Sequence, residues 1–295
     1  MSIRTLSRVG VAAVAVSALA LAGCSSSDEA ETSATPESSS STEATAAAGA
    51  ELETVTEGKF TIATGEPAYE PWMVDNEPTN GEGFEAAVAY AVAEELGYSP
   101  EDVEWVRTSF ETAIAPGVKD WDVNIQQFSI TEERKNAVDF SSPYYTTSQA
   151  IVADADSDLA TATSVADLAG YRIGVPSGTT SYAVAAESIG EDDLAVFNSA
   201  EDTVAAFNSG QIDGFITDLP SAFYLSAVEL DNGAIVGQFP AEDEGDGDQF
   251  AFVLPKDSPN TATVTAAVDV LNENGTLAAL ETEWLSDAVD VPVLD

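Results

Sequence analysis

Two stretches of this chain share one plan: "SFETAIAPGVKDWDVNIQ" (109–126) and "SAEDTVAAFNSGQIDGFIT" (199–217). Each begins with a residue suited to capping a helix, followed by acidic residues and a short apolar helix. After a turn, each ends in an apolar strand that opens on aspartate. This repetition predicts two similar lobes, each with a β-α-β unit. In open α/β sheets, ligands bind beyond the carboxyl ends of the strands, so facing lobes would enclose a cleft.

The rest of the chain alternates strand-like and helix-like segments, which predicts parallel sheets of the α/β class. Residues 83–97 give the clearest helix, and Gly97 can supply its left-handed cap. Its apolar face comprises Phe84, Val88, Ala91, Val92 and Leu96. We expect strands at residues 59–64, 103–108, 121–128, 171–176, 194–197, 212–218 and 249–255. We expect helices at residues 110–118, 164–170, 179–190, 200–210 and 220–229, and two more, broken at Gly275, at the end.

The N-terminus has the layout of a secretory signal, because Arg4 and Arg8 precede an apolar run too short for a typical membrane span. The run leads into "LAGC" (21–24), which resembles a lipobox, where Cys24 is lipidated after residues 1–23 are removed. The alternative is an ordinary secretory signal with a chance cysteine. A diacylated cysteine carries the two chains that stable anchoring needs, so we expect an extracytoplasmic, lipid-anchored protein.

Residues 24–56 are rich in Ser, Thr, Ala and Glu, and this composition predicts a disordered tether. The folded part then begins at residue 57. The formal net charge is −43, and removal of Arg4 and Arg8 makes the mature chain more acidic still. Such acidity argues against nucleic acid as a partner. The chain has no histidine, which excludes Ser-His-Asp and Cys-His catalysis and histidine-ligated metals.

A scarce cation stands in "SITEERKNAVDFSSPYY" (129–145), which contains Arg134. An arginine fork fits a carboxylate, and an aspartate on an opposing lobe, such as Asp218, would accept from an ammonium group. Together they would bind the two ends of an amino-acid zwitterion. Thr131 fits as a helix N-cap, with Glu132 and Glu133 in the first turn. The alternatives are a surface ion pair for Arg134 and a helix N-cap role for Asp218.

The chain from Gly58 to Leu285 resembles the amino-acid-type (family 3) solute-binding proteins of ABC importers. The matching segments are "EPAYEPW", "GEGFEAAVAYAVAEELG", "SITEERKNAVDFSSPYY", "LAGYRIGVPSGTT", "NSGQIDGFITD" and "NENGTLAALETEW". The resemblance implies a two-lobed periplasmic-binding-protein-like fold (type II) with two crossing segments. Lobe 1 would comprise residues 57–149 plus 250–295, and lobe 2 residues 150–249. The crossings are expected near residues 148–153 and 248–254.

The resemblance also implies roles for individual residues. Arg134, Ser129 and Thr180 would bind the carboxylate of the ligand, whereas Asp218 and the backbone near Gln127 would accept from its ammonium group. Tyr69 and Phe110 would form aromatic walls around the ligand side chain, Glu66 would contact that side chain, and Pro176 and Ser181 would border its pocket. Three features depart from the family pattern: Ala87 replaces a usual aspartate, Gln126 and Gln127 replace small residues, and the loop "APGVKDWD" is shorter.

The expected function is capture of a polar amino acid and its delivery to an ABC permease, by a monomer without cofactor, metal or catalytic residues. The acidic residues 241–249 lack the spacing of a calcium-binding loop, so we expect a solvated loop there. Glutamine, an arginine-like cation and glutamate remain open as ligands, depending on where Arg107 points. The rival functions are a cyclohexadienyl or arogenate dehydratase-like enzyme, with Glu66 as its candidate acid or base, and a sensory lipoprotein without transport.

Overall fold

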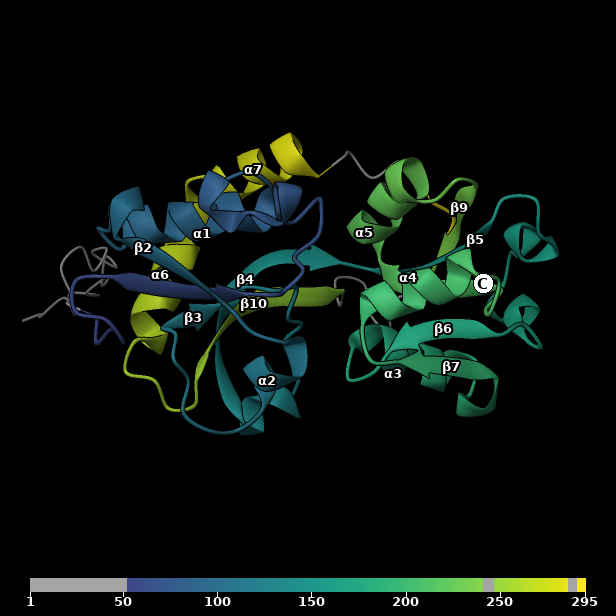
Figure 1. Ribbon diagram of the computed structural model, residues 1–295, viewed down its shortest axis with the longest axis horizontal. Helices are drawn as coiled ribbons and strands as arrows, with labels where there is room; N and C mark the ends of the chain where they lie inside the picture. The colour runs from purple at the N-terminus through teal and green to yellow at the C-terminus, as the bar shows by residue number, and fades with distance from the viewer. Residues whose placement is uncertain (1–51, 241–246, 286–290) are drawn as a thin grey trace, which may run out of the picture. The chain divides into compact units, whose positions relative to one another are not determined.

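The computed structural model describes residues 52–240, 247–285 and 291–295 and contains two five-stranded sheets (Figure 1). The signal segment 1–23, Cys24 and most of the acidic loop 241–249 lie outside the described residues. The first sheet has the order β2-β1-β3-β10-β4. Its strands are β1 (Phe60–Thr64), β2 (Val103–Arg107), β3 (Val123–Asn124), β4 (Val138–Thr147) and β10 (Asp248–Pro255). The second sheet has the order β7-β6-β8-β5-β9. Its strands are β5 (Gln149–Asp154), β6 (Ile173–Pro176), β7 (Leu194–Phe197), β8 (Gly214–Asp218) and β9 (Gly233–Gln238).

Both sheets are mixed, so the prediction of parallel sheets is correct only for part of each. β1 runs parallel to β2 and β3, and β6 runs parallel to β7 and β8. In contrast, β10 is antiparallel to β3 and β4, and β5 is antiparallel to β8 and β9. The antiparallel pairs arise where the chain passes from one sheet to the other, because the strand that leaves and the strand that returns lie side by side.

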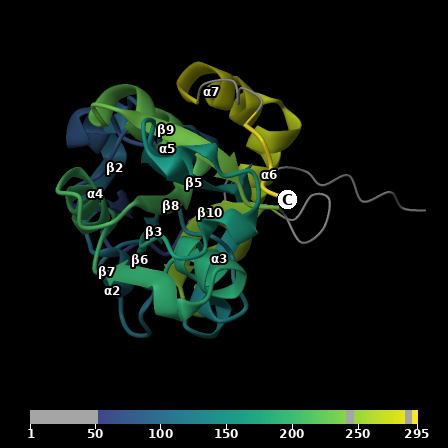
Figure 2. The ribbon, with the colours of Figure 1, turned by 90° about the vertical axis from the view of Figure 1, so that its right-hand side faces the viewer.

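Helices α1 (Phe84–Glu95), α6 (Thr261–Glu273) and α7 (Thr276–Trp284) pack with one face of the first sheet, and α2 (Phe110–Ile114) packs with the other. Figure 2 shows α6 and α7 next to each other. The expected break at Gly275 is confirmed, as is the left-handed Gly97 after α1. The core beneath these helices includes Phe60, Ile62 and Phe252, which are fully buried. Burial of such side chains contributes about 1.5–3 kcal/mol each.

The second sheet is also covered on two faces. α3 (Thr180–Ser188) packs with one core, whereas α4 (Ala200–Asn208) and α5 (Leu219–Tyr224) pack with the other. Figure 1 shows α3 and α4 on opposite sides of β6. The polar caps predicted in the repeated stretches are both present, since Ser109 accepts from Thr112 N and Ser199 accepts from Asp202 N. The expected helix 220–229 is found as α5 followed by a π-helical turn, η8 (Leu225–Glu229).

The chain crosses between the sheets at Ser148, the first residue of the predicted segment 148–153, whose other residues lie inside β5, and returns between Gln238 and Asp248. The return therefore precedes the predicted segment 248–254, which lies inside β10. The last residues also differ from the expected boundary, because Gln238 N donates to Pro292 O (2.9 Å) and Leu294 N donates to Gln238 O (2.9 Å). Residues 291–295 thus pair with the second sheet, although the sequence placed 250–295 in the first lobe.

Three strands and the bounds of two further segments were not predicted correctly. β4, β5 and β9 have no counterpart among the predicted strands. β4 contains Pro143 and carries polar residues at many positions, which obscures its strand pattern. The predicted strand 121–128 shortens to the two residues of β3. The tether was predicted to reach residue 56, but Glu53 N and Val55 N donate to Asn260 Oδ1 (3.0 Å) and Asp122 Oδ1 (2.7 Å). The described helices include none that is long and apolar enough to span a membrane.

Candidate functional site

Arg134 stands at the start of a short 3-10 helix, η4 (Arg134–Asn136). Arg134 N donates to Thr131 Oγ1 (3.2 Å), the bond expected of a capping residue, but η4 begins later than predicted: its N-cap position is Glu133, and neither glutamate lies in its first turn. Glu132 forms an ion pair with Lys135 (2.7 Å) at the surface. Glu132 is therefore engaged by Lys135, and among the described residues neither it nor Glu133 forms an ion pair with Arg134.

The guanidinium of Arg134 is buried and bonded to neutral groups. Nη1 donates to Ser129 O (2.7 Å) and Nη2 donates to Gly178 O (2.9 Å), so the guanidinium joins the first sheet to the loop before α3. It also lies 5.2 Å from the centre of the Phe110 ring. Within the described residues no carboxylate lies within 4 Å of Arg134, so the surface ion pair considered above is not present. Burial lowers the pKa of Arg134, and Asp248 and Asp218 oppose this effect.

Ser129 and Thr180 meet across the two halves of the molecule. Ser129 pairs with Phe250 of β10, and its Oγ lies 3.3 Å from Thr180 Oγ1. Thr180 is the first residue of α3, and the preceding Thr179 caps that helix by accepting from Tyr182 N (3.1 Å). The N-terminus of a helix favours an anion, because backbone N–H groups and the helix dipole point there.

Asp218 lies at the carboxyl end of β8 and shares an amide with a second carboxylate. Gln149 Nε2 donates to Asp218 Oδ1 (2.6 Å) and to Asp248 Oδ2 (2.5 Å). Gln149 Oε1 accepts from Ser181 Oγ (2.7 Å), which fixes the orientation of the amide. Burial, with Asp248 nearby, raises the pKa of Asp218 to about 7. Asp218 occupies the N-cap position of α5, as the alternative supposed, but its side chain makes no capping hydrogen bond.

A third carboxylate, Glu85 of α1, is fully buried beneath the same region. Gln127 N (2.7 Å) and Tyr144 Oη (2.5 Å) donate to Glu85 Oε1, and Gln127 Nε2 donates to Oε2. Burial raises the pKa of Glu85 to about 7, although these three donors oppose the shift. Gln127 adopts a positive φ of 49° and is bonded to Glu85 through both its backbone and its amide. Gln127 therefore supports a buried acid.

The residues assigned to the ligand side chain are more dispersed. Glu66 is exposed and forms an ion pair with Arg107 (3.4 Å), whose Nη1 donates to Gly65 O (2.5 Å) and to Asn76 Oδ1 (2.9 Å). Arg107 thus neutralises Glu66. Phe110 stacks on Phe128 with ring centres 4.6 Å apart. Burial, with Glu201 and Asp202 of α4 nearby, raises the pKa of Tyr69 to about 12.

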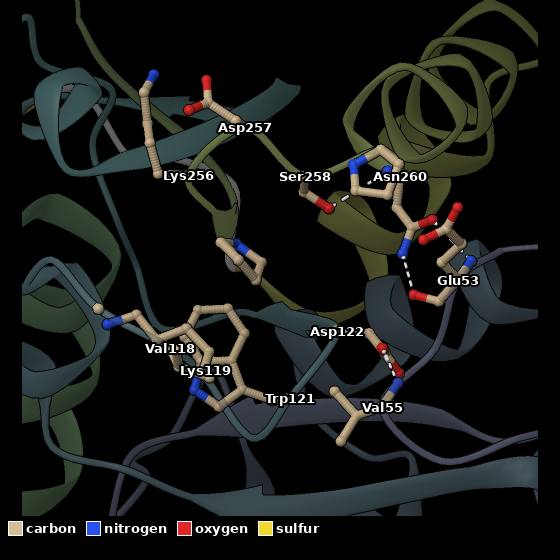
Figure 3. Close-up of a pocket in the computed structure, with 13 residues that line it drawn as sticks. Glu53, Val55, Val118, Lys119, Trp121, Asp122, Lys256, Asp257, Ser258 and Asn260 are labelled. Atoms are coloured by element: carbon tan, nitrogen blue, oxygen red, sulfur yellow. Dashed lines mark hydrogen bonds between the residues drawn. The ribbon is translucent and has the colours of Figure 1, made fainter.

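The pocket drawn in Figure 3 lies at the other end of β10, around Lys256, Asp257 and Ser258. There the side chains of Asn260 and Asp122 point toward the segment that holds Glu53 and Val55. These contacts attach the first described residues to the first sheet. None of the predicted site residues lines this pocket, so we interpret it as structural.

The sequence analysis missed Glu85, Gln149 and Asp248. A signal existed for Glu85, because it shares the buried side of α1 with Val88, Ala89 and Val92. Gln149 and Asp248 are 99 residues apart in sequence, and no pattern connects them. Among the predicted residues, the structure brings together Arg134, Ser129, Thr180 and Asp218 through Gln149. Among the described residues, no hydrogen bond or ion pair joins the side chain of Glu66 or Tyr69 to that group.

Comparison with known proteins gives a consistent result. The sequence model of the bacterial extracellular solute-binding proteins, family 3, matches residues 61–287. The arginine-binding extracellular protein ArtP of Bacillus subtilis is 29% identical over 233 residues, covering 78% of this chain and 88% of ArtP. An ancestral arginine-binding protein bound to arginine has a TM-score of 0.63 and 28% identity, covering 77% of this chain and 98% of its own. The ancestral amino acid-binding protein AncCDT-1, a precursor of cyclohexadienyl dehydratase, has a TM-score of 0.64 and 26% identity, with 78% and 96% covered.

Proposed function

The chain belongs to family 3 of the bacterial extracellular solute-binding proteins, and from this premise we propose that it captures a polar amino acid outside the cytoplasm and delivers it to an ABC importer. Relatives named for the binding of arginine support an amino acid as the ligand class. The permease would be the protein partner, and the binding protein would act as a monomer without a cofactor.

One observation supports this function above all others: a single group of residues in contact contains an arginine at one end and an aspartate at the other. Arg134 bonds to Ser129, Ser129 meets Thr180, and Gln149 bonds to Asp218. Thr180 Oγ1 lies 3.5 Å from Gln149 Nε2, so the two parts of the group are in contact, although both N–H bonds of that amide are directed to the nearer Asp218 and Asp248. An α-amino acid carries a carboxylate and an ammonium group on one carbon and fits such a pair of opposite charges.

In this proposal the ligand first contacts one lobe, and closure of the second lobe completes the site. The proposed lobes follow the two sheets, with the chain crossing at Ser148 and between Gln238 and Asp248. A ligand that contacts both lobes binds the closed form more tightly than the open form, and this difference in affinity stabilises closure. Phe110 and Tyr69 would border the ligand side chain, and Glu66, neutralised by Arg107, would contribute an acceptor oxygen.

A thermal-shift panel tests the proposal. We expect at least one of the twenty L-amino acids, ornithine or citrulline to raise the melting temperature of the purified protein in proportion to RT ln(1 + [L]/Kd). If none of them changes the melting temperature, the protein does not bind an amino acid of this class and the proposal is wrong.

The dehydratase-like alternative deserves a separate test, because AncCDT-1 is a precursor of such an enzyme. Its candidate acid or base, Glu66, is exposed and forms an ion pair with Arg107 (3.4 Å), so Glu66 is engaged by this chain's own arginine. We therefore propose binding without turnover. Chromatography of prephenate or arogenate after prolonged incubation with the protein should return the compound unchanged, and conversion to product would establish an enzyme.

We also propose that Cys24 carries a lipid anchor and that residues before 52 act as a signal and a tether. The support is the sequence alone, because these residues lie outside the described part of the structure. Labelling of cells with a fatty-acid analogue should mark the wild-type protein and leave Cys24→Ser unlabelled. Measuring ligand uptake in cells that lack this protein separates transport from a purely sensory role. Uptake should fall if the protein delivers the ligand to an importer, and it should be unchanged if the protein only senses the ligand.

A further inference from the structure

We propose that Asp248 is a second carboxylate of the ligand site, which binds the ligand's ammonium group together with Asp218 while Gln149 holds the two carboxylates in position. This inference rests on the proposed capture of an amino acid. No sequence motif and no part of the family resemblance points to a role for Asp248. Its position follows from the structure alone.

The amide of Gln149 determines the geometry of the pair. The NH2 group has two N–H bonds, and it directs one to Asp218 Oδ1 (2.6 Å) and the other to Asp248 Oδ2 (2.5 Å). Gln149 is buried, and Ser181 Oγ donates to its carbonyl (2.7 Å), so the amide cannot turn without losing that bond. The remaining oxygens, Asp218 Oδ2 and Asp248 Oδ1, accept no side-chain or backbone hydrogen bond from the described residues outside their own. They are left as acceptors.

The charges around the pair favour a cationic occupant. Asp218 is faced by Asp248 of β10 and by Glu85 of α1. Burial makes the largest contribution to its raised pKa, and the repulsion from these two carboxylates raises it further. Tyr144 and Tyr145 of β4 lie within range of Asp218 but are uncharged at neutral pH, because burial raises their pKa values further. Arg134 is the cation of this region, yet it lies beyond 4 Å from either carboxylate and donates to backbone carbonyls. An ammonium group would supply the missing positive charge.

The position of the pair links it to closure. Gln149 is the first residue of β5, directly after the crossing at Ser148, and Asp248 is the first residue of β10, paired with Thr147. Asp218 belongs to β8, which pairs with Gln149. An ammonium group held by both carboxylates would thus contact the two segments through which the lobes are connected, in addition to the second lobe itself.

Isothermal titration of Asp248→Asn tests the inference. The probes are the tightest binder among the twenty L-amino acids, ornithine and citrulline, and its 2-hydroxy analogue, which lacks the ammonium group. We expect Asp248→Asn to weaken binding of the amino acid by about 10- to 100-fold, the range for a charge-assisted hydrogen bond. Binding of the hydroxy analogue should change by less than about threefold. Asp269→Asn, the same change on the exposed side of α6, should leave both unchanged.

The outcomes separate the inference from the proposed function. Wild-type protein that binds no amino acid contradicts both. Wild-type binding with an unchanged affinity in Asp248→Asn overturns only the role of Asp248. Asp248→Glu should retain the preference for the amino acid over the hydroxy analogue, and equal losses for both probes in that variant would assign Asp248 a structural role. If Asp248→Asn does not fold, Gln149→Met is used in its place. This variant should bind the amino acid at least about tenfold more weakly, and its affinity for the hydroxy analogue should be unchanged.

Discussion

The two ends of the proposed site carry opposite charges, and at each end the charged side chains are hydrogen-bonded to neutral groups. At one end Arg134 is surrounded by neutral acceptors, the carbonyls of Ser129 and Gly178. At the other end Asp218 and Asp248 are held by a neutral donor, the amide of Gln149. Neutral partners satisfy hydrogen bonds without cancelling charge, so each end retains its attraction for an ion. By contrast, Glu66 and Arg107 pair with each other (3.4 Å) and largely cancel.

The comparison also explains the use of scarce cations. The chain has nine lysine and arginine residues and 52 acidic ones. Three of the ion pairs seen among the described residues involve surface lysines, which contribute little to stability. Arg134 is instead buried against Phe110, where desolvation makes its interactions stronger. A buried arginine without a carboxylate partner is therefore the feature that most clearly marks a site for an anionic group.

The largest effect is expected from removing the cationic end. Arg134→Met should weaken binding of the amino acid by at least about 100-fold, because a charge-assisted, bidentate contact is lost. Titration calorimetry measures this change. Arg172→Met, which removes an exposed arginine, is the control and should bind as the wild type does. Wild-type affinity in Arg134→Met would show that Arg134 does not bind the ligand and that only the anionic end belongs to the site.

The buried acid beneath the anionic end should matter for stability. Glu85→Leu leaves Gln127 N and the Tyr144 hydroxyl buried without a partner, and we expect a loss of about 3 kcal/mol in the free energy of unfolding. Glu85→Gln should cost less than about 1 kcal/mol, because Oε1 keeps both donors and the Gln127 amide can turn to accept from the new NH2 group. Urea denaturation measures both changes. Equal losses would indicate that the charge itself is required.

The raised pKa values predict how stability depends on pH. Asp218 and Glu85 each have a pKa of about 7 in the folded protein, above their ordinary values. The folded state binds their protons more tightly than the unfolded state, so this stabilisation is complete below about pH 4 and is lost as the pH rises through about 7. The melting temperature of the ligand-free protein should therefore rise between about pH 8 and pH 5, by roughly 2–4 °C for each kcal/mol.

Glu85→Gln provides the matched control for this pH dependence. It removes one of the two titrating groups, so its melting temperature should rise less than that of the wild type over the same pH range. A melting temperature that falls from about pH 8 to pH 5 in the wild type would contradict the raised pKa values of both acids.

The smallest effect is expected at a contact that joins the two halves away from the charges. Trp72 Nε1 donates to Ser221 Oγ (2.9 Å), which links the core of the first sheet to α5. Ser221→Ala removes this acceptor, and a loss of about 1 kcal/mol should lower ligand affinity by about fivefold. Small-angle scattering should show a larger radius of gyration without ligand and a wild-type value with ligand. An unchanged affinity would mean that the contact does not contribute to closure.

The sequence predicted the elements with strong local signals. The caps at Ser109 and Ser199, the left-handed Gly97 and the break at Gly275 are all present, because each depends on residues within a few positions of one another. The expected bond from Arg134 N to Thr131 is also present. β4, β5 and β9 were missed. β10 was placed in a parallel sheet, because strand direction depends on how the chain returns from the other sheet. The boundary at the C-terminus was missed for the same reason.

The sequence by itself determined the α/β class, the family resemblance and the identity of Arg134 as the cation to examine. These follow from periodicity, capping residues and motif spacing, which are properties of short segments. Only the tertiary structure placed Gln149 between Asp218 and Asp248 and buried Glu85 with Gln127 and Tyr144. Contacts between residues so distant in sequence leave no local pattern, and burial, which sets the pKa of each acid, depends on the packing of the whole fold.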